Sequence, residues 1–260
     1  MAGRGVGVAR LPVHPPTLAI GKWVCMSLYW NILHENFWAF ARGAWLTVEL
    51  TAVSLFIATF IGLLVALMKI SSLWTLRLIA DGFIGLIRGL PLIVQLMFLY
   101  YGITALLVLP AFWAGSIALA VCEGAYVAEI FRGSIQSIDT GQYQAARSLG
   151  MPHWLAMRRI VLPQAAKRAI PPMGNQFIIG LKDSSLVAYL GVMELFGTAL
   201  LVQANTFRAM QAFAVAGLYY LIMVMAITLV LRRVERRLGA TTQRPSASAR
   251  RAIKERLRSV

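Results

Sequence analysis

The chain has 260 residues, of which 59% are hydrophobic and 13% are charged, and its mean hydropathy is +0.70. This composition excludes an ordinary soluble globular protein and indicates an integral membrane protein. The formal net charge of +15 would suggest nucleic acid as a partner of a soluble protein. Here most basic residues fall in loops and in the C-terminal tail, so we expect no nucleic-acid partner and use the charge to assign topology.

The N-terminal 40 residues contain no apolar run long enough to span a membrane. Residues 1–22 lack a long apolar core followed by a small-residue cleavage site, so no cleaved signal peptide is expected. Residues 23–40 are rich in tryptophan and phenylalanine, whose rings favour the headgroup level of a bilayer. The sequence therefore predicts a tail and a short interfacial helix over residues 1–40.

Apolar runs account for most of the remaining chain. About 20 apolar residues are needed to cross a bilayer as a helix, and we expect Pro91 to kink one such helix. Gly102 and Pro110 mark a turn between two of the runs. The expected fold class is an all-α integral membrane protein with about five transmembrane helices within residues 41–235. The predicted spans are residues 43–68, 83–104, 112–131, 169–189 and 209–231.

The distribution of Lys and Arg predicts the topology. Five crossings place three basic connections on one face, whereas the two connections on the opposite face contain Arg208 as their only basic residue. By the positive-inside rule the basic face is cytoplasmic, which puts the N-terminus outside and the C-terminus inside. The basic connections are residues 69–77, the polar loop 133–168 and the C-terminal tail 236–260.

The most informative polar stretch, residues 141–163, reads GQYQAARSLGMPHWLAMRRIVLP. It is basic and amphipathic and lies between apolar runs. Ala145 and Ala146 permit close approach to a partner, while Gly150 and Pro152 force a break between two short helices. We expect the second helix to end at the closing proline. The stretch is predicted to be a docking surface; an ordinary amphipathic cytoplasmic helix is the alternative interpretation.

Several motifs give the chain a family resemblance from about residue 45 to residue 238. The docking stretch resembles the EAA loop of ABC importer permeases, with Gln144 where the family usually has Glu. The other stretches resemble the permeases of polar amino acid ABC importers, the histidine, glutamine, glutamate and arginine subfamily. Leu90 replaces the Thr of that subfamily's RGTPLLVQ motif. These stretches are RGLPLIVQ (88–95), GAYVAEIFRG (124–133), GNQF (174–177) and LKDSSL (181–186).

The resemblance implies a type I ABC importer permease of MetI-like fold with a cytoplasmic coupling helix, in a bacterial inner membrane. It implies ABC ATPase subunits, a second identical or paralogous permease subunit, an extracytoplasmic solute-binding protein and a polar amino acid substrate as partners. The partner ATPase would use ATP and Mg, and this chain would bind no cofactor. The expected docking residues are Gln144, Ala145, Ala146, Arg147, Leu149, Gly150, Met151 and Pro152.

Polar residues inside predicted spans are candidates for the substrate pathway. An ionisable group near the bilayer centre costs several kcal/mol, so it usually faces protein or a water-filled pathway. Helix packing or an interfacial position is the alternative, and we expect Glu49 and Glu129 to have structural or capping roles. The pathway candidates are Glu123, Asn175, Lys182, Asp183 and Ser184.

The sequence also disfavours other classes of protein. Its only Gly-Lys dipeptide, Gly21-Lys22, precedes Trp23, so no P-loop is present. We therefore expect a transport subunit and not an enzyme, with ATP hydrolysis on a separate chain. The His and Cys residues lack metal-ligand spacing, and no metal site is expected. The remaining alternatives are an ABC permease for another small polar solute and, less favoured, an ion-coupled secondary transporter.

Overall fold

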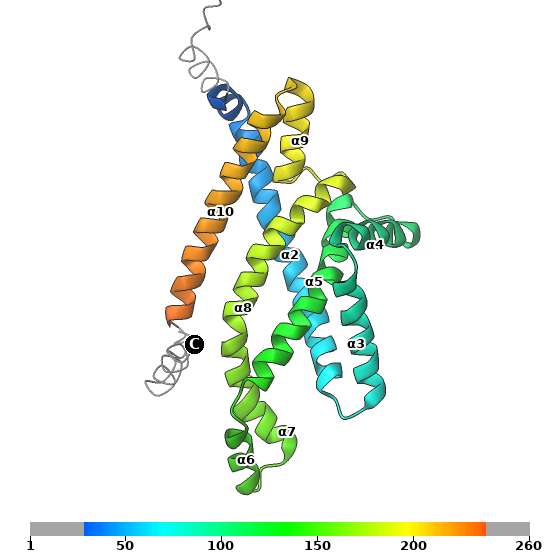
Figure 1. Cartoon of the computed structure of the whole chain (residues 1–260), viewed down its shortest axis with the longest axis vertical. Coiled ribbons are helices and arrows are strands. Elements are labelled where there is room, and N and C mark those ends of the chain that lie inside the picture. Colours follow the sequence, from blue (N-terminus) through cyan, green and yellow to red (C-terminus); the bar gives the residue numbers. More distant parts are fainter. Residues whose placement is uncertain (1–28, 238–260) are drawn as a thin grey trace, which may run out of the picture.

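The computed structural model describes residues 29–237, and these residues contain no β-strand. The expectations for residues 1–28 and for residues 238–260 of the basic tail lie outside the described residues. Residues 29–35 are helical and precede the labelled elements of Figure 1. These elements are α2 (Phe37–Ile70), α3 (Trp74–Gly89), α4 (Leu92–Leu106), α5 (Ala111–Gln136), α6 (Thr140–Ser148), α7 (His153–Ala156), η1 (Met157–Val161), α8 (Leu162–Asp183), η2 (Ser184–Leu190), α9 (Leu195–Thr206) and α10 (Ala209–Arg237).

The two long helices α2 and α5 form the centre of the bundle (Figure 1). Glycines allow their backbones to approach closely. A Cβ atom on Gly62 would lie 2.5 Å from Val127 of α5, and one on Gly124 would lie 2.7 Å from Ile61 of α2. Small residues at helix contacts are typical of membrane bundles, where dispersion contacts between close helices drive association.

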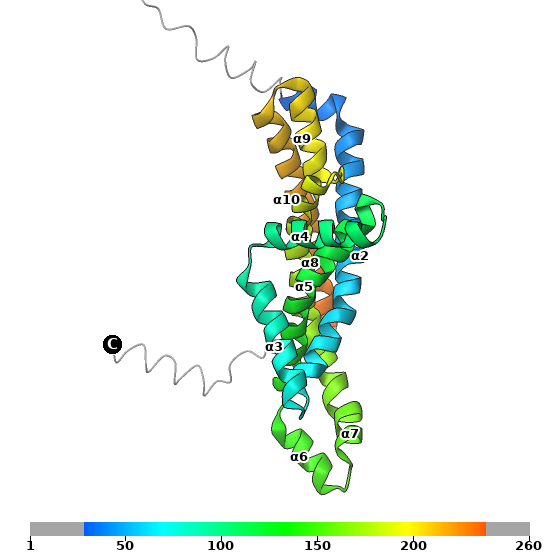
Figure 2. The ribbon, with the colours of Figure 1, turned by 90° about the vertical axis from the view of Figure 1, so that its right-hand side faces the viewer.

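The predicted second span is broken, which corrects the expectation of one helix over residues 83–104. Leu90 is extended, with φ −108° and ψ 147°, and Pro91 precedes the first residue of α4. A residue before proline is driven out of the helical region by the proline ring. The helices α3 and α4 therefore meet at 114°, and α4 lies across the long axis of the molecule in both Figure 1 and Figure 2.

The break leaves backbone carbonyls to be satisfied by a side chain. The Gln95 amide donates hydrogen bonds to the carbonyls of Ile87 and Leu90, both at 2.6 Å. Pro110 lies directly before the first residue of α5, as expected for a turn, whereas Gly102 lies inside α4. Gln95 therefore stabilises the break that Pro91 creates.

The second helix of the stretch 141–163 does not end at Pro163, which corrects a second expectation. Instead α7, η1, α8 and η2 follow one another without interruption. The element η1 is a π-helical turn in which the Leu162 N–H donates to the Met157 carbonyl, five residues back. This wider turn shifts the hydrogen-bond register just before Pro163, which has no N–H to donate.

The described helices account for the expected number of spans. Three helices, α2, α5 and α10, are long and apolar enough to cross a membrane, and up to five spans result if each bent helix pair counts as one. The second bent pair joins residues 153–190 to α9 at 48°. Residues 37–40 form the first turn of α2, although we expected them in a separate interfacial helix. The prediction of about five spans therefore holds only with two spans bent.

Candidate functional site

The predicted docking stretch forms an elbow, which we define as α6, the connection 149–152 and α7, at the lower end of the bundle in Figure 1. Asp139 caps α6, because its carboxylate accepts a hydrogen bond from the Gly141 N–H at 2.8 Å. Ala146 of α6 and Ala156 of α7 are buried, at 2% and 0% exposed, whereas Leu149 between them is 84% exposed. The helix α6 therefore lies at the end of the molecule with most of its side chains exposed.

The break predicted at Gly150 and Pro152 is confirmed, and its geometry is a Schellman motif. The Met151 N–H donates to the Ala146 carbonyl, and the Gly150 N–H donates to the Arg147 carbonyl. Gly150 takes the left-handed conformation that closes this motif, with φ +80°. Pro152 then precedes α7. The backbone conformation therefore favours glycine here. Space is not the reason, because no atom lies within 4 Å of a Cβ placed at this position.

Side chains fasten the two arms of the elbow to each other. The Tyr143 hydroxyl and His153 Nδ1 lie 2.8 Å apart, and the two rings pack edge to face. Arg147 donates to the Met151 carbonyl at 2.7 Å. These contacts cross the break, so the angle between α6 and α7 is set by several bonds.

The elbow is also fastened to the bundle. Arg168 of α8 donates to the carbonyl and the hydroxyl of Ser137, which follows the last residue of α5. Within the elbow, Tyr143 of α6 packs against an apolar cluster that contains Ile138, Val161 and Ala165. Gln164 of α8 also donates to the Gln142 side chain of α6 at 3.1 Å. A displacement of the elbow would therefore be transmitted directly to α5 and α8.

A pocket of about 510 Å³ opens on the elbow. Its wall combines the capping acid with small and apolar side chains, and exposed apolar groups beside a concavity are typical of protein–protein contacts. The lining residues include Asp139, Gln142, Ala145, Leu149, Met151 and Ile160. Four of the predicted docking residues, Ala145, Ala146, Leu149 and Met151, therefore line this pocket.

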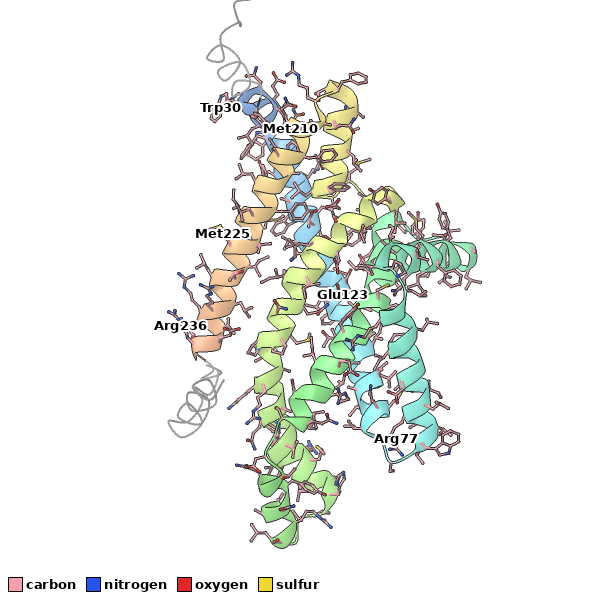
Figure 3. The ribbon with its side chains drawn as sticks, viewed as in Figure 1. Trp30, Arg77, Glu123, Met210, Met225 and Arg236 are labelled. Atoms are coloured by element: carbon pink, nitrogen blue, oxygen red, sulfur yellow. The ribbon has the colours of Figure 1, made fainter. Side chains whose placement is uncertain are left out.

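The predicted pathway residues are not gathered at one point. Glu123 of α5 is 4% exposed and lies at mid-height in the bundle (Figure 3). It accepts a hydrogen bond from Gln176 of α8, and a Cβ on Gly180 would lie 3.0 Å from its Oε1. Glu123 therefore fixes α8 against α5. Sequence reasoning quoted Gln176 in a motif but did not identify it as the partner of Glu123.

The other four candidates lie along α8 and the first turn of η2. Asn175 and Lys182 are exposed, Asp183 is half-buried and Ser184 is fully buried. The Ser184 hydroxyl donates to the Leu181 carbonyl at 2.9 Å, a bond within its own helix. The exposed candidates, Asn175 and Lys182, therefore lie on α8, the helix that Glu123 holds through Gln176.

One buried acid was missed as a functional residue by the sequence reasoning. Glu194 is fully buried and caps α9, accepting from the N–H groups of Phe196 and Gly197 at 2.9 and 2.7 Å. It also accepts from the Tyr220 hydroxyl of α10 at 3.0 Å and from the Thr47 hydroxyl of α2 at 3.1 Å. An acid directly before an apolar helix was the available signal. Glu194 joins three helices at the end opposite the elbow.

The described residues offer no site for a resident metal. Residues 29–237 contain no group of three or more His, Cys, Asp or Glu side chains placed to hold an ion. Cys122 is buried with a free thiol, and Cys25 lies outside the described residues.

Comparison with known proteins identifies close relatives over most of the chain. The glutamine transport system permease protein GlnP of Escherichia coli is 34% identical over 216 residues, covering 82% of this chain and 99% of that protein. The arginine transport system permease protein ArtQ of Bacillus subtilis is 36% identical over 199 residues, covering 76% and 91%. The L-cystine transport system permease protein TcyB of the same species is 34% identical, covering 86% and 95%.

Solved structures agree with this relationship. The crystal structure of an amino acid ABC transporter with histidines matches with a TM-score of 0.74 at 40% identity, covering 79% of this chain and 96% of that one. An inward-facing MetNI methionine ABC transporter matches with a TM-score of 0.67 at 20% identity, covering 78% and 97%, and supports the fold alone. The predicted MetI-like fold class is confirmed.

The family described as "Binding-protein-dependent transport system inner membrane component" matches residues 58–240. This match includes the elbow, the broken span and α8. It confirms the prediction of a transport subunit whose ATPase is a separate chain, and the predicted resemblance to amino acid ABC permeases. The chain belongs to the family of binding-protein-dependent transport system inner membrane components.

Proposed function

We propose that this chain is the permease subunit of an ATP-driven importer that carries a polar amino acid into the cytoplasm. The observation that carries the proposal is the exposed elbow, held at one end of an apolar bundle by a Schellman break and fastened to α5 and α8. Relatives that transport glutamine, arginine and cystine, as their names state, support an amino acid as the cargo.

In this proposal the elbow, within the coupling loop 133–168, receives an ABC ATPase subunit. The partner ATPase uses ATP and Mg, and its closure displaces α6. The bonds from Arg168 to Ser137 pass that displacement to α5 and α8. Gln144 is exposed on α6, and without a carboxylate at this position docking rests on the small side chains and the pocket.

The charge distribution supports the orientation in a bacterial inner membrane. Figure 3 shows Arg77 in the lower half of the molecule and Arg236 at the lower end of α10, whereas Trp30 and Met210 lie at the end opposite the elbow. Under the positive-inside rule the elbow end is cytoplasmic, with the N-terminus outside and the C-terminus inside. A solute-binding protein would then deliver substrate to the end that carries α9.

A second permease subunit, identical or paralogous, completes the pathway in this proposal. The break between α3 and α4 lies within an apolar segment, and irregular backbone at membrane depth is tolerated where protein or a water-filled cavity covers it. The exposed side chains Asn175 and Lys182, with Asp183 and Ser184 above them, form this chain's contribution to the pathway wall. Glu123 supports that wall through Gln176.

The test is uptake of amino acids by the complete complex in proteoliposomes. The permease, its ATPase and its binding protein are reconstituted, and a panel of radiolabelled polar amino acids is screened with ATP inside the vesicles on the ATPase side. We expect ATP-dependent uptake of at least one polar amino acid and stimulation of ATP hydrolysis by the same compound. Uptake driven by an ion gradient without ATP would contradict the proposal and favour a secondary transporter.

A further inference from the structure

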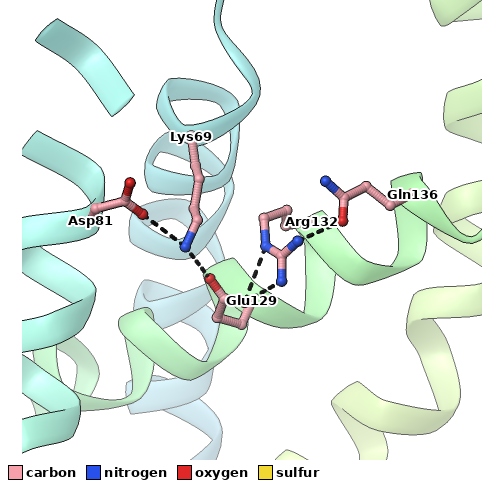
Figure 4. Close-up of polar contacts among 5 residues, drawn as sticks. All are labelled: Lys69, Asp81, Glu129, Arg132 and Gln136. Atoms are coloured by element: carbon pink, nitrogen blue, oxygen red, sulfur yellow. Dashed lines mark hydrogen bonds and ion pairs between the residues drawn. The ribbon is translucent and has the colours of Figure 1, made fainter. Parts of the chain in front are cut away.

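Four charged side chains, from the last turn of α2, the middle of α3 and the second half of α5, meet in one cluster (Figure 4). Lys69 Nζ lies 2.8 Å from Glu129 Oε1 and 2.9 Å from Asp81 Oδ1. Arg132 donates to Glu129 Oε2 from Nε at 3.1 Å and from Nη2 at 2.6 Å. Two positive and two negative charges therefore balance, and Glu129 is central because each of its oxygens serves a different cation. We call these four residues the ion-pair cluster.

The cluster is more protected than a typical surface ion pair. The side chains of Glu129, Lys69 and Arg132 are 20%, 24% and 29% exposed, whereas that of Asp81 is 57% exposed. An isolated exposed ion pair contributes little, but a network of partly buried, charge-assisted hydrogen bonds holds its geometry more firmly. Removal of Glu129 should therefore have a larger effect than removal of Asp81.

The helix α3 has few other contacts that would fix its position along its axis. Its buried residues are Ala80, Ile84 and Ile87, and four of the seven buried members of the apolar cluster around them are alanines. Larger side chains, among them Met68, Phe83 and Phe131, pack against this cluster, but dispersion contacts of this kind have no preferred direction. Two contacts of α3 depend on direction: the bond from Lys69 to Asp81, the neighbour of Ala80, and the Arg88 guanidinium, 5.8 Å from the centre of the Tyr126 ring of α5. The first of these joins α3 to α2 and, through Glu129, to α5.

Polar contacts connect this cluster to the elbow. Arg132 donates to Gln136, the last residue of α5, and the next residue, Ser137, is held by Arg168. Asp139 then caps α6. The same cluster reaches α3, which leads to the break before α4.

We propose that Glu129 is a positioning residue that makes α2, α3 and α5 move as one body when the elbow is displaced. Through the ion-pair cluster, force that enters at α6 reaches α3 and hence the broken span. This inference rests on the proposed function, because it requires an ATPase at the elbow. It goes beyond that function by assigning a transmission role to a residue that contacts neither the ATPase surface nor the pathway wall.

The first test measures coupling in the reconstituted complex. With the amino acid that gives the highest uptake for the unmodified chain, Glu129→Gln should reduce uptake at least tenfold and bring stimulated ATP hydrolysis to within twofold of the basal rate. The basal rate and the ratio of ATPase to permease should stay unchanged. Asp81→Asn should have a smaller effect, and Glu49→Gln, which alters an exposed acid on α2, should have none.

The second test measures the motion itself by pulsed electron paramagnetic resonance. Spin labels are placed at Arg77→Cys on α3 and Gly133→Cys on α5, two exposed positions, after Cys25 and Cys122 have been replaced. ATP binding should leave the label distance unchanged in the otherwise unmodified complex. With Glu129→Gln added, the distribution should broaden or shift on ATP binding.

The outcomes separate this inference from the proposed function. If the unmodified complex shows no ATP-driven uptake, the proposed function fails. If it transports normally and Glu129→Gln does so too, with an unchanged label distance, the inference alone is overturned. A Glu129→Gln variant that loses the ATPase subunit or unfolds at markedly lower temperature would also overturn it, since the residue would then serve only stability.

Discussion

Two helices of this molecule begin with an acidic cap, and the surroundings of the two caps differ completely. Asp139 caps α6 at the elbow through one exposed hydrogen bond to a backbone N–H. Glu194 caps α9 at the opposite end and is fully buried, with four donors from three helices. The same kind of cap therefore begins an exposed helix at the proposed ATPase surface and a buried helix that joins three helices of the bundle.

The difference shows where the molecule is built to be rigid. At the Glu194 end, the side chains of Thr47 and Tyr220 bring α2 and α10 to the start of α9, and Leu195 donates its N–H to Thr47 as well. At the elbow, the side-chain bonds are mainly local: Tyr143 pairs with His153, and Arg147 donates to the Met151 carbonyl. An applied force at the elbow would thus act against a fixed opposite end.

The largest expected effect comes from removing the buried cap. Glu194→Ala leaves the N–H groups of Phe196 and Gly197 and the Tyr220 hydroxyl without their acceptor, so we expect a loss of at least about 3 kcal/mol in stability. The Thr47 hydroxyl keeps the Gly43 carbonyl as an acceptor at 2.9 Å. Thermal unfolding of the purified permease complex in detergent measures this loss. Glu49→Ala, an exposed acid in α2, is the matched control and should change stability by no more than about 0.5 kcal/mol. Equal melting temperatures for the two variants would show that the Glu194 network does not hold the bundle.

A smaller effect on stability, but a large one on transport, is expected at the Schellman break. Gly150→Val forces a β-branched residue into a positive φ, a strained conformation, at a position with no steric neighbour. The elbow angle should change, and uptake should fall at least tenfold while the protein still inserts into the membrane. Gly150→Asn is the matched variant, because Asn tolerates the left-handed region, and it should retain most of the uptake. Normal uptake by Gly150→Val would refute the role of the elbow in docking.

The contrast between the two caps also explains which features were predictable from sequence. The elbow break depends on Gly150 and Pro152, which are separated by one residue in its short connection, and local rules predicted it correctly. The bond between Glu194 and Thr47 joins residues 147 positions apart, and the bond between Lys69 and Glu129 joins residues 60 positions apart. Pairings at such separations depend on how helices pack and leave no periodic signal in one sequence.

The two errors at prolines have the same origin. Pro91 was expected to kink a span, but the size of the bend depends on Gln95 satisfying the freed carbonyls and on α4 finding a place across the bundle. Pro163 was expected to end a helix, but the π-helical turn before it removes the conflict with the backbone register. A proline predicts where a helix is disturbed, whereas tertiary contacts decide whether it bends, breaks or continues.

The smallest expected effect is at the exposed cap. Asp139→Ala removes one hydrogen bond from the first turn of α6 and should destabilise that helix by about 1 kcal/mol, with little change in the unfolding of the whole bundle. Because α6 lies at the proposed ATPase surface, the loss should appear as a weaker affinity for the ATPase subunit, by about threefold to tenfold. Binding of the labelled ATPase to permease in nanodiscs measures this affinity, and Asp139→Asn, which retains a capping oxygen, should stay close to the unmodified chain. Thermal unfolding of the same variants completes the comparison. If Asp139→Ala lowered the unfolding temperature of the bundle as much as Glu194→Ala does, the elbow would be part of the rigid core. The proposed difference between a rigid Glu194 end and an elbow that moves would then be wrong.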